Sequence, residues 1–517
     1  MESCVIEQPG ILRGETFIPA AQLNERSARA ASALRAAGVD RGDAVALLLR
    51  NDHPFFEAYF AAGLIGAAPV PLNWHGKPDE ILFVLQDCRA RVLVAHADLV
   101  RPLIGRLPAD LKVRVVATPQ DIAAAYRIAP ADCIVPQDTL EWSSWIESFE
   151  PRKESPVEAP AAMMYTSGTT GKPKGVRRPA TSLAHREKSA YYADIAKLSG
   201  FAPGVRAVVV GPMYHGAPLA WATGWARTNS FIVLQARFDA EDLLRLIDKH
   251  RITNLLLVPI MFTRLLKLPE HVRRSYDLSS LRHVTHGAAP CPRSVKEQMI
   301  DWWGPVIYEQ YGSLEIGLVT CANSEEWLSH PGTVGRPLSG VELKILDDNG
   351  EEVPVGETGQ IYSRIADQPD FAYEGLPDAR AEVVRDGFVT AGDVGYLDAD
   401  GFLYLCDRKK DVVISGGVNI YPAEIEACIL TLDGVRDVAV FGIPDEEYGE
   451  SLAAAVELDR SVALSAEDIR AHVRANLAAF KTPRLVEFLD EIPRLESGKI
   501  LKRELRKTYW AETGRSI

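Results

Sequence analysis

The stretch Tyr165-Thr-Ser-Gly-Thr-Thr-Gly-Lys-Pro-Lys-Gly-Val176 has the composition of a loop that binds phosphate groups. Small hydroxyl and glycine residues fill Thr166–Gly171, and two lysines follow. Such a backbone can wrap closely around an anion while hydroxyl and ammonium groups converge on it. It is not a P-loop, because the GxxxxGK[ST] pattern begun at Gly168 would need a glycine where Pro173 stands. An ordinary solvated turn is the alternative.

The length and composition of the chain indicate a multidomain globular protein. At 517 residues it exceeds the roughly 250 to 300 at which one hydrophobic core stops growing, so at least two domains are expected. Hydrophobic residues make up 47% and charged residues 25%, as in ordinary soluble proteins. The formal net charge of -13 argues against a nucleic-acid partner, because phosphate backbones are bound through an excess of Lys and Arg.

The cysteines and the apolar runs bear on the cellular compartment. The 7 cysteines are scattered without CxxC spacing, which favours neither a zinc cluster nor a disulfide framework. Residues 1–10 lack the basic and apolar parts of a signal peptide. The most apolar run, Tyr59–Leu72, is interrupted by two glycines and a proline and is shorter than the ~20 residues of a membrane helix. We expect a cytoplasmic protein without a membrane span, and leave open whether it is a homodimer.

The first half of the chain alternates between helical and strand patterns. Ala20–Gly38 has helical spacing with Gly38 as its C-terminal cap, and Pro54 and Pro78 each stand where the first turn of a helix would begin. Residues 137–160, rich in Pro, Glu and Ser, are expected to form an exposed approach to the phosphate loop. Strands are predicted at 44–49, 70–72, 91–95, 206–210, 254–258 and 282–285, with a helix at 240–250 capped by Asp239. This order predicts two parallel α/β sheets.

The pattern changes in the second half. From Thr333 onward, short strands joined by turn signals such as Asp348-Asn349-Gly350 predict a β-rich subdomain. Beyond Asp407, strands near 412, 435–441 and 452–458 flank helices near 422–430 and 465–479, which indicates a small α+β unit. The expected fold is α/β. A large N-terminal domain, residues 1–408, holds two α/β sheets and the β-rich subdomain, and a small α+β C-terminal domain covers residues 409–517.

Six segments resemble, in order, the signatures of the AMP-forming adenylating enzymes, the family of acyl-CoA synthetases, luciferases and peptide-synthetase adenylation domains. Beside the phosphate stretch they are Gly287-Ala-Ala-Pro290, Tyr308-Glu-Gln-Tyr-Gly-Ser-Leu-Glu315, Thr390-Ala-Gly-Asp393, Asp407-Arg-Lys-Lys-Asp-Val-Val-Ile-Ser-Gly-Gly-Val-Asn-Ile-Tyr-Pro-Ala-Glu-Ile-Glu426 and Pro493-Arg-Leu-Glu-Ser-Gly-Lys-Ile-Leu-Lys-Arg-Glu-Leu505. Ser313, Ala391 and Val418 depart from the family's commoner residues, but none of these changes removes an essential charge. The N-terminal part resembles the family in pattern only.

The resemblance implies a site for ATP, Mg²⁺ and coenzyme A. Tyr311 would stack on adenine, and Asp393 would accept hydrogen bonds from the ribose hydroxyls, for which a carboxylate is a strong partner. Glu315 would be the metal ligand, since Mg²⁺ takes hard oxygen ligands beside substrate phosphates. The residues assigned to ATP or AMP are Thr166, Ser167, Gly168, Thr169, Thr170, Gly171, Lys172, Lys174, Gly287, Ala288, Ala289, Pro290, Glu309, Gln310, Tyr311, Gly312, Ser313, Asp393, Arg408 and Lys499.

The catalytic and conformational roles also follow from the resemblance. The catalytic residues would be Lys499, Glu315, Thr170 and His215. Lys499 would reach the α-phosphate and the substrate carboxylate, and His215 corresponds to an aromatic or histidine gate near the carboxylate pocket. Lys410 falls on the position of a hinge about which the C-terminal domain moves. Ser415, Gly416 and Gly417 would form part of the channel for coenzyme A.

The implied activity is that of an acyl-CoA synthetase, a ligase of fatty acid or lipid metabolism. A carboxylic acid and ATP would give acyl-adenylate and pyrophosphate, and coenzyme A would then give acyl-CoA and AMP. Leu219, Trp221, Trp225 and Phe231 would fall near the acyl pocket and favour a bulky apolar acid, although a role in the core is an equal alternative.

Two other functions stay open. The acyl group could pass to a carrier protein or partner ligase, or the chain could be a nucleotide-binding regulator without turnover. Retention of Lys499 and Glu315 argues against the regulator, because a mere binder needs neither at the reacting phosphate. Hydrolase, zinc-peptidase and dinucleotide-binding functions lack support, because the sequence holds no GxSxG, HExxH or GxGxxG.

Overall fold

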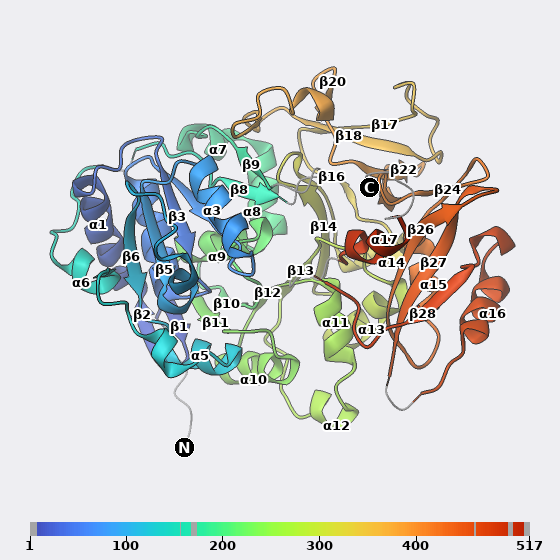
Figure 1. Cartoon of the computed structure of the whole chain (residues 1–517), viewed down its shortest axis with the longest axis horizontal. Coiled ribbons are helices and arrows are strands. Elements are labelled where there is room, and N and C mark those ends of the chain that lie inside the picture. Colours follow the sequence, from blue (N-terminus) through green and yellow to red (C-terminus); the bar gives the residue numbers. More distant parts are fainter. Residues whose placement is uncertain (1–7, 156, 167–172, 460–461, 495–499, 511–517) are drawn as a thin grey trace. The chain divides into compact units, whose positions relative to one another are not determined.

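The computed structural model describes residues 8–155, 157–166, 173–459, 462–494 and 500–510 (Figure 1). The chain forms two compact units. The first comprises Met1–Leu257, Lys267–Thr285 and Ile365–Val384, and the second comprises Val258–Leu266, His286–Arg364 and Arg385–Ile517. The domain boundary predicted after Arg408 falls inside the second unit and remains a prediction. None of the helices in the described ranges is long and apolar enough to cross a membrane.

A parallel sheet in the first unit has the strand order β4-β3-β5-β6-β7. All side chains of β3 and β5 are buried, as expected for central strands covered on both faces. The strands are β3 Ala44–Leu48, β4 Ala68–Pro71, β5 Val92–His96, β6 Lys112–Val116 and β7 Leu140–Glu141. The helices of this part are α1 Ala20–Ala36, α2 His53–Leu64, α3 Pro78–Asp87, α4 Ala97–Val100, α5 Gln120–Tyr126 and α6 Trp142–Glu147.

The local signals for these helices are confirmed. Helix α1 ends before Gly38, whose φ of 82° is the left-handed conformation that glycine adopts at such an end without steric cost. Pro54 and Pro78 stand in the first turns of α2 and α3, where the missing N–H has no helical partner to lose. Asp52 caps α2 by accepting a hydrogen bond from the backbone N–H of His53.

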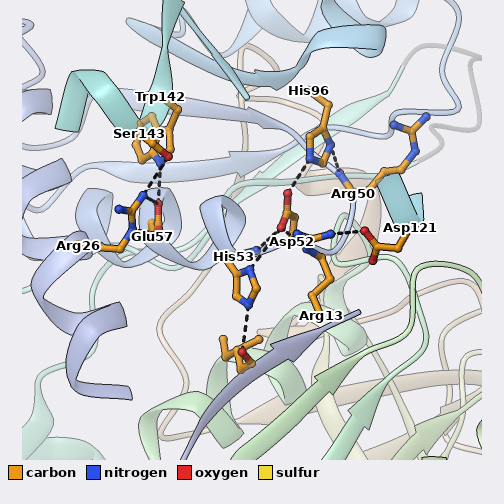
Figure 2. Close-up of polar contacts among 11 residues, drawn as sticks. Arg13, Arg26, Arg50, Asp52, His53, Glu57, His96, Asp121, Trp142 and Ser143 are labelled. Carbon is orange, nitrogen blue, oxygen red and sulfur yellow. Dashed lines mark hydrogen bonds and ion pairs between the residues drawn. The ribbon is translucent and has the colours of Figure 1, made fainter. Parts of the chain in front are cut away.

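The expectation of an exposed stretch over residues 137–160 is wrong in part. Residues 140–147 form β7 and the short helix α6, and the Trp142 side chain is fully buried. Its indole N–H donates to Glu57 Oε2 at 2.7 Å, and Arg26 pairs with the same carboxylate (Figure 2). Ile146 of the same helix is also fully buried. The surrounding Pro, Glu and Ser residues concealed these anchors, because the average composition of a segment does not reveal one or two buried side chains.

A second sheet of the first unit has the order β13-β12-β10-β11-β1-β2, in which the strands from β12 to β1 pair in parallel and β1 and β2 form an antiparallel hairpin. Its strands are β1 Gly10–Arg13, β2 Thr16–Pro19, β10 Arg206–Val209, β11 Phe231–Leu234, β12 Asn254–Leu257 and β13 His283–His286. The predicted cap of α10 is confirmed, since Asp239 accepts from the N–H of Asp242 at 2.8 Å. The helices of this part are α7 Leu183–Lys188, α8 Ala190–Leu198, α9 Gly216–Arg227, α10 Ala240–His250 and α12 Glu270–Arg273.

A small antiparallel sheet, β19-β9-β8, carries the ends of the phosphate stretch. Its strands are β8 Met164–Thr166, β9 Lys174–Arg177 and β19 Ala372–Tyr373. The Tyr165 hydroxyl donates to Asp87 Oδ2 at 2.6 Å, and a Cβ at position 175 would lie 2.8 Å from the Tyr165 ring. Gly175 is therefore required for this close approach.

The second unit contains the predicted β-rich part. Strands β14 Ile307–Ser313, β15 Gly317–Ala322 and β16 Arg336–Pro337 are antiparallel. A separate sheet holds β17 Val341–Leu346, β18 Gly359–Ile365, β21 Phe388–Val389, β22 Asp393–Leu397 and β23 Leu403–Arg408. Helices α11 Pro259–Leu266, α13 Arg293–Trp303 and α14 Ser324–Ser329 belong to the same unit.

The C-terminal α+β arrangement is also confirmed. The strand order is β25-β24-β27-β26, with β28 added in parallel to β27. A core of aliphatic side chains, including Val413, Ile425, Val440 and Val473, lies between this sheet and its helices. The elements are β24 Val413–Ser415, β25 Val418–Ile420, β26 Val435–Asp445, β27 Gly449–Leu458, β28 Leu485–Phe488, α15 Pro422–Ile429, α16 Ala466–Asn476 and α17 Lys502–Trp510.

Candidate active site

Three predicted nucleotide-binding residues, from three separate segments, meet in the second unit. The Tyr311 hydroxyl donates to Asp393 Oδ2 at 2.9 Å, and Arg408 Nε pairs with Asp393 Oδ1 at 3.2 Å. Antiparallel pairing of β22 with β23 sets Asp393 opposite Arg408. Burial, reinforced by the negative charge of Asp393, raises the pKa of Tyr311 well above its usual value, so the hydroxyl remains a donor. The carboxylate is thus fixed in orientation, and its remaining lone pairs can accept further hydrogen bonds.

The turn Gly287–Pro290 packs against the strand that carries Tyr311. A Cβ at Gly287 would lie 2.6 Å from the backbone oxygen of Gln310, so only glycine allows this approach. Ala288 has a φ of 68°, which is uncommon for a residue with a side chain. Strained backbone of this kind persists where the surroundings fix it, and it is common at ligand sites.

The carboxylate of Glu309 does not face outward from β14. It is paired with Lys296 of α13, with Nζ 2.6 Å from Oε2, and the Lys296 side chain is 0% exposed. Lys296 also lies 4.8 Å from the ring centroid of Trp327. Burial raises the pKa of Glu309, and the positive charge of Lys296 opposes that rise. A role of Glu309 in nucleotide binding remains a prediction, and this carboxylate is already engaged.

His286 completes this buried cluster. Its Nε2 lies 3.6 Å from Glu309 Oε2, and its ring packs edge-on against Phe262. Burial, followed by the positive charge of Lys296, lowers the pKa of His286 well below its usual value. His286 is therefore neutral, and Lys296 is the cation that balances Glu309.

The proposed metal ligand stands at the turn after β14. The Ser313 hydroxyl donates to Glu315 Oε2 at 2.9 Å and accepts from the backbone N–H of Glu315 at 3.2 Å. The strand pairing shifts register between Tyr311 and Gly312, and a Cβ at Gly312 would lie 2.2 Å from the Gly317 oxygen. Such a bulge redirects the following side chains. A half-buried carboxylate oriented in this way has the donor chemistry that Mg²⁺ requires.

The phosphate stretch enters and leaves through a β-hairpin in the first unit. Thr166 of β8 pairs with Lys174 of β9 in the antiparallel register, and the ammonium of Lys174 lies 5.3 Å from the ring centroid of Tyr373. Ser167, Gly168, Thr169, Thr170, Gly171 and Lys172 lie outside the described residues, and so does Lys499. Their assigned roles remain predictions from the sequence.

His215 and the proposed acyl-pocket residues also lie in the first unit. His215 is the N-terminal flanking residue of α9, and its ring centroid is 4.3 Å from that of Tyr214. Leu219, Trp221 and Trp225 of α9 and Phe231 of β11 are all buried. Trp221 contacts Phe201 edge to face at 5.7 Å. Burial is compatible with a core role and with a pocket wall, so the pocket assignment remains a prediction.

The hinge and channel positions lie near one another in the sequence and have different surroundings. Arg506 of α17 donates to the backbone oxygens of Lys410 and Asp411 at 3.2 and 3.3 Å. Ser415 ends β24, and Gly416 and Gly417 form a two-residue turn with φ of 56° and 82°. Two consecutive positive φ values define the hairpin turn that glycine favours. The motif is therefore an exposed, tight hairpin tip.

Some residues of this region could not be singled out from the sequence. Lys296 lies in a helix whose composition is unremarkable for a surface helix, and nothing marks it as buried. The helix cap at Asp52 could have been suggested by the following His53-Pro54. The neighbouring Asn51 could not be singled out, because its side-chain amide bonds to Gly211, 160 residues away. Such partners depend on packing that periodicity does not encode.

Comparisons with known proteins bear on the whole chain. Residues 13–366 match the AMP-binding enzyme family, and residues 424–499 match the AMP-binding enzyme C-terminal domain. The fatty acid–[acyl-carrier-protein] ligase ScoC of Streptomyces coeruleorubidus is 32% identical over 524 residues, covering 98% of this chain and 95% of the relative. A feruloyl-CoA synthase of Amycolatopsis sp is 34% identical over 507 residues, covering 96% and 95%. The structure of ATP-bound MatB from Rhodopseudomonas palustris is similar, with a TM-score of 0.82 and 26% identity, covering 97% and 96%.

Proposed function

This chain belongs to the AMP-binding enzyme family, whose members include acyl-CoA ligases, and we propose that it activates a bulky apolar carboxylic acid and transfers the acyl group to coenzyme A. The observation that carries the proposal is the convergence of Tyr311, Asp393 and Arg408. The family resemblance assigns Tyr311 to the adenine base, Asp393 to the ribose and Arg408 to a second contact with the ribose. A fixed carboxylate beside a buried phenol suits the donors of a ribose ring.

In the first step, a carboxylate oxygen attacks the α-phosphorus of ATP. The bond between that phosphorus and the oxygen that bridges to the β-phosphate breaks, and pyrophosphate leaves. Lys499 and the stretch Thr166–Lys174 stabilise the negative charge that grows on the phosphate oxygens, because preformed cations and donors act most strongly where charge develops. Glu315 would hold Mg²⁺, which when bound would neutralise phosphate charge.

In the second step, the thiol sulfur of coenzyme A attacks the acyl carbonyl carbon. The bond from that carbon to the AMP oxygen breaks, so the oxygen stays with AMP and the thioester forms. The hairpin tip Ser415–Gly417 belongs to this step, and Lys410 is the hinge that lets the residues after Arg408 serve each step in turn. The predicted domain boundary between residues 408 and 409 lies directly before this hinge.

The apolar side chains of α9 and β11 support a bulky apolar acid. Leu219, Trp221, Trp225 and Phe231 are contributed by two adjoining elements that follow His215. An alternative acceptor is a carrier protein, which the similarity to a fatty acid–[acyl-carrier-protein] ligase favours. Both acceptors present a thiol, so the first step is the same for either.

The proposal is tested in two stages. Purified protein, ATP and Mg²⁺ are incubated with aromatic, fatty and polycyclic acids, and acyl-adenylate is trapped with hydroxylamine. The acids that respond are then offered coenzyme A or a holo acyl-carrier protein. We expect hydroxamate from at least one bulky apolar acid and thioester with coenzyme A. Hydroxamate without either thioester would refute the transfer step, and ATP binding without hydroxamate from any acid would favour a nucleotide-binding regulator.

A further inference from the structure

The segment Gly211–His215, which lies between β10 and α9, is held by one asparagine in the connection between β3 and α2. The Asn51 side-chain amide donates to the Gly211 oxygen at 2.9 Å, and the Met213 backbone N–H donates to Asn51 Oδ1 at 3.0 Å. Asn51 is 6% exposed and Met213 1%. A carboxamide offers a donor and an acceptor side by side, so one side chain satisfies both backbone groups. Asn51 therefore ties the first sheet to the segment that carries His215.

A neighbouring aromatic contact acts on the same segment. The Trp74 ring meets the Tyr214 ring edge to face, with centroids 5.7 Å apart. The guanidinium of Arg50 lies 5.0 Å from the Trp74 ring centroid and 4.7 Å from that of Tyr126. Such stacking of a cation on aromatic faces is attractive, most of all where water is excluded. Tyr214, adjacent to His215, thus packs against Trp74, whose ring also contacts the guanidinium of Arg50, the residue that precedes Asn51.

The backbone on both sides of Asn51 is itself fixed, as Figure 2 shows. The backbone N–H of Arg50 donates to His96 Nδ1 at 3.1 Å, so the ring hydrogen of His96 is on Nε2. This Nε2 donates to Asp52 Oδ2 at 3.0 Å. The other oxygen of Asp52 pairs with Arg13 Nε at 2.8 Å.

The Arg50 guanidinium is held as well. It forms two hydrogen bonds to the carboxylate of Asp98, at 3.0 and 2.9 Å. A bidentate pair of this kind fixes orientation as well as distance. Asn51 is therefore presented from a turn that has little freedom to move.

From these contacts we propose that Asn51 is a positioning residue for the carboxylic acid. It sets the backbone of Gly211–His215 and so the position from which His215 meets the acid. The inference rests on the proposed function, because only that function assigns His215 to the acid pocket. Both hydrogen bonds of the Asn51 side chain act on the segment Gly211–His215, so we expect its replacement to affect use of the acid more than use of ATP.

The first test measures steady-state kinetics of Asn51→Ala with octanoate and ferulate as aliphatic and aromatic probes. Misplacing a substrate-positioning group by about 1 Å can cost roughly 100-fold, so we expect KM for the acid to rise roughly 10- to 100-fold. KM for ATP should change by less than about 2-fold, because the segment that Asn51 holds is assigned to the acid. A uniform loss of folded protein would instead lower the apparent kcat and leave both KM values unchanged. The matched control is Asn254→Ala, since Asn254 is another buried asparagine, whose amide donates to the Gly200 oxygen at 2.9 Å.

The second test needs no substrate. Hydrogen–deuterium exchange of the peptide that contains Met213 should quicken roughly 5-fold or more in Asn51→Ala, as expected when an internal hydrogen bond is lost, and should not change in Asn254→Ala. Should Asn51→Ala fail to fold, Asn51→Asp keeps the acceptor for Met213 and loses the donor to Gly211, so it should raise KM for the acid alone. Unchanged exchange at Met213, or equal rises of both KM values, would overturn the proposal. A wild-type protein that makes no adenylate would instead refute the proposed function and leave the exchange result to decide on Asn51.

Discussion

Replacing Lys296 with methionine should destabilise the second unit strongly. In the unsubstituted protein, Lys296 Nζ lies 2.6 Å from Glu309 Oε2. Methionine keeps a long apolar side chain at this position but leaves the Glu309 carboxylate buried without its cation. Breaking a buried ion pair from one side costs about 3 to 5 kcal/mol. At about 2 to 4 °C per kcal/mol, the expected fall in Tm is roughly 6 to 20 °C.

The assay is thermal unfolding at pH 7.5 with two matched variants. Arg364→Met breaks the exposed Arg364–Glu342 pair, also at 2.6 Å, and should lower Tm far less, because exposed ion pairs contribute little to stability. The double variant Lys296→Met with Glu309→Leu removes both charges and should recover most of the loss. Equal shifts for Lys296→Met and Arg364→Met, or a double variant no better than the single, would refute the reasoning.

The stability lost in Lys296→Met should depend on pH in a definite direction. Burial already raises the pKa of Glu309 above its unfolded value, and removing Lys296 takes away the charge that opposes this rise. The folded state then binds a proton that the unfolded state has released, so stability falls as pH rises above the unfolded pKa. The deficit of Lys296→Met relative to wild type should therefore be smaller at pH 5 than at pH 8. A deficit that grows towards pH 5 would contradict this assignment.

Three further predictions concern the chemistry. Tyr311→Phe removes the hydrogen bond to Asp393 and should raise KM for ATP roughly 10-fold. The control Tyr404→Phe loses a hydrogen bond to Asp398 at 3.2 Å and should leave KM for ATP unchanged. Equal KM values for the two variants would count against the ribose assignment. Lys499→Ala should slow acyl-adenylate formation ~10²- to 10³-fold while preformed adenylate still reacts with coenzyme A, and near-normal pyrophosphate release would exclude this role. Lys410→Pro fixes φ at the hinge and should slow thioester formation far more than adenylation in single-turnover assays; equal slowing would show that Lys410 is not the pivot.

Much of the architecture was predictable because its signals are local. Asp239 before an amphipathic repeat marked the start of α10, and Gly38 marked the end of α1, since capping depends on residues within one turn. The short apolar strands between them indicated a covered parallel sheet. Helix α6 was missed because a Pro-, Glu- and Ser-rich background surrounds the two buried side chains, Trp142 and Ile146, that anchor it.

The motifs of the candidate site could be recognised from the sequence, but most of the contacts among their side chains could not. The motif that contains Tyr311 could be recognised in the sequence, but its partner Asp393 is 82 residues away on a strand of another sheet, and only tertiary packing brings the two together. The assignment of Glu309 to the nucleotide remains a prediction, and the pairing of its carboxylate with Lys296 could not be predicted, because a sequence does not show on which side of a strand a charged group finds its partner. Asn51 gave no signal, since both of its partners are backbone groups.

The most direct test of the central claim follows the oxygen of the acid. An acid that supports hydroxamate formation is labelled with ¹⁸O in its carboxylate and converted with ATP and coenzyme A, and the products are analysed by mass spectrometry. Attack on the α-phosphorus predicts that one ¹⁸O appears in AMP, in step with thioester formation, and none in pyrophosphate. Label in inorganic phosphate with ADP as the nucleotide product, or AMP without label, would contradict an adenylate intermediate.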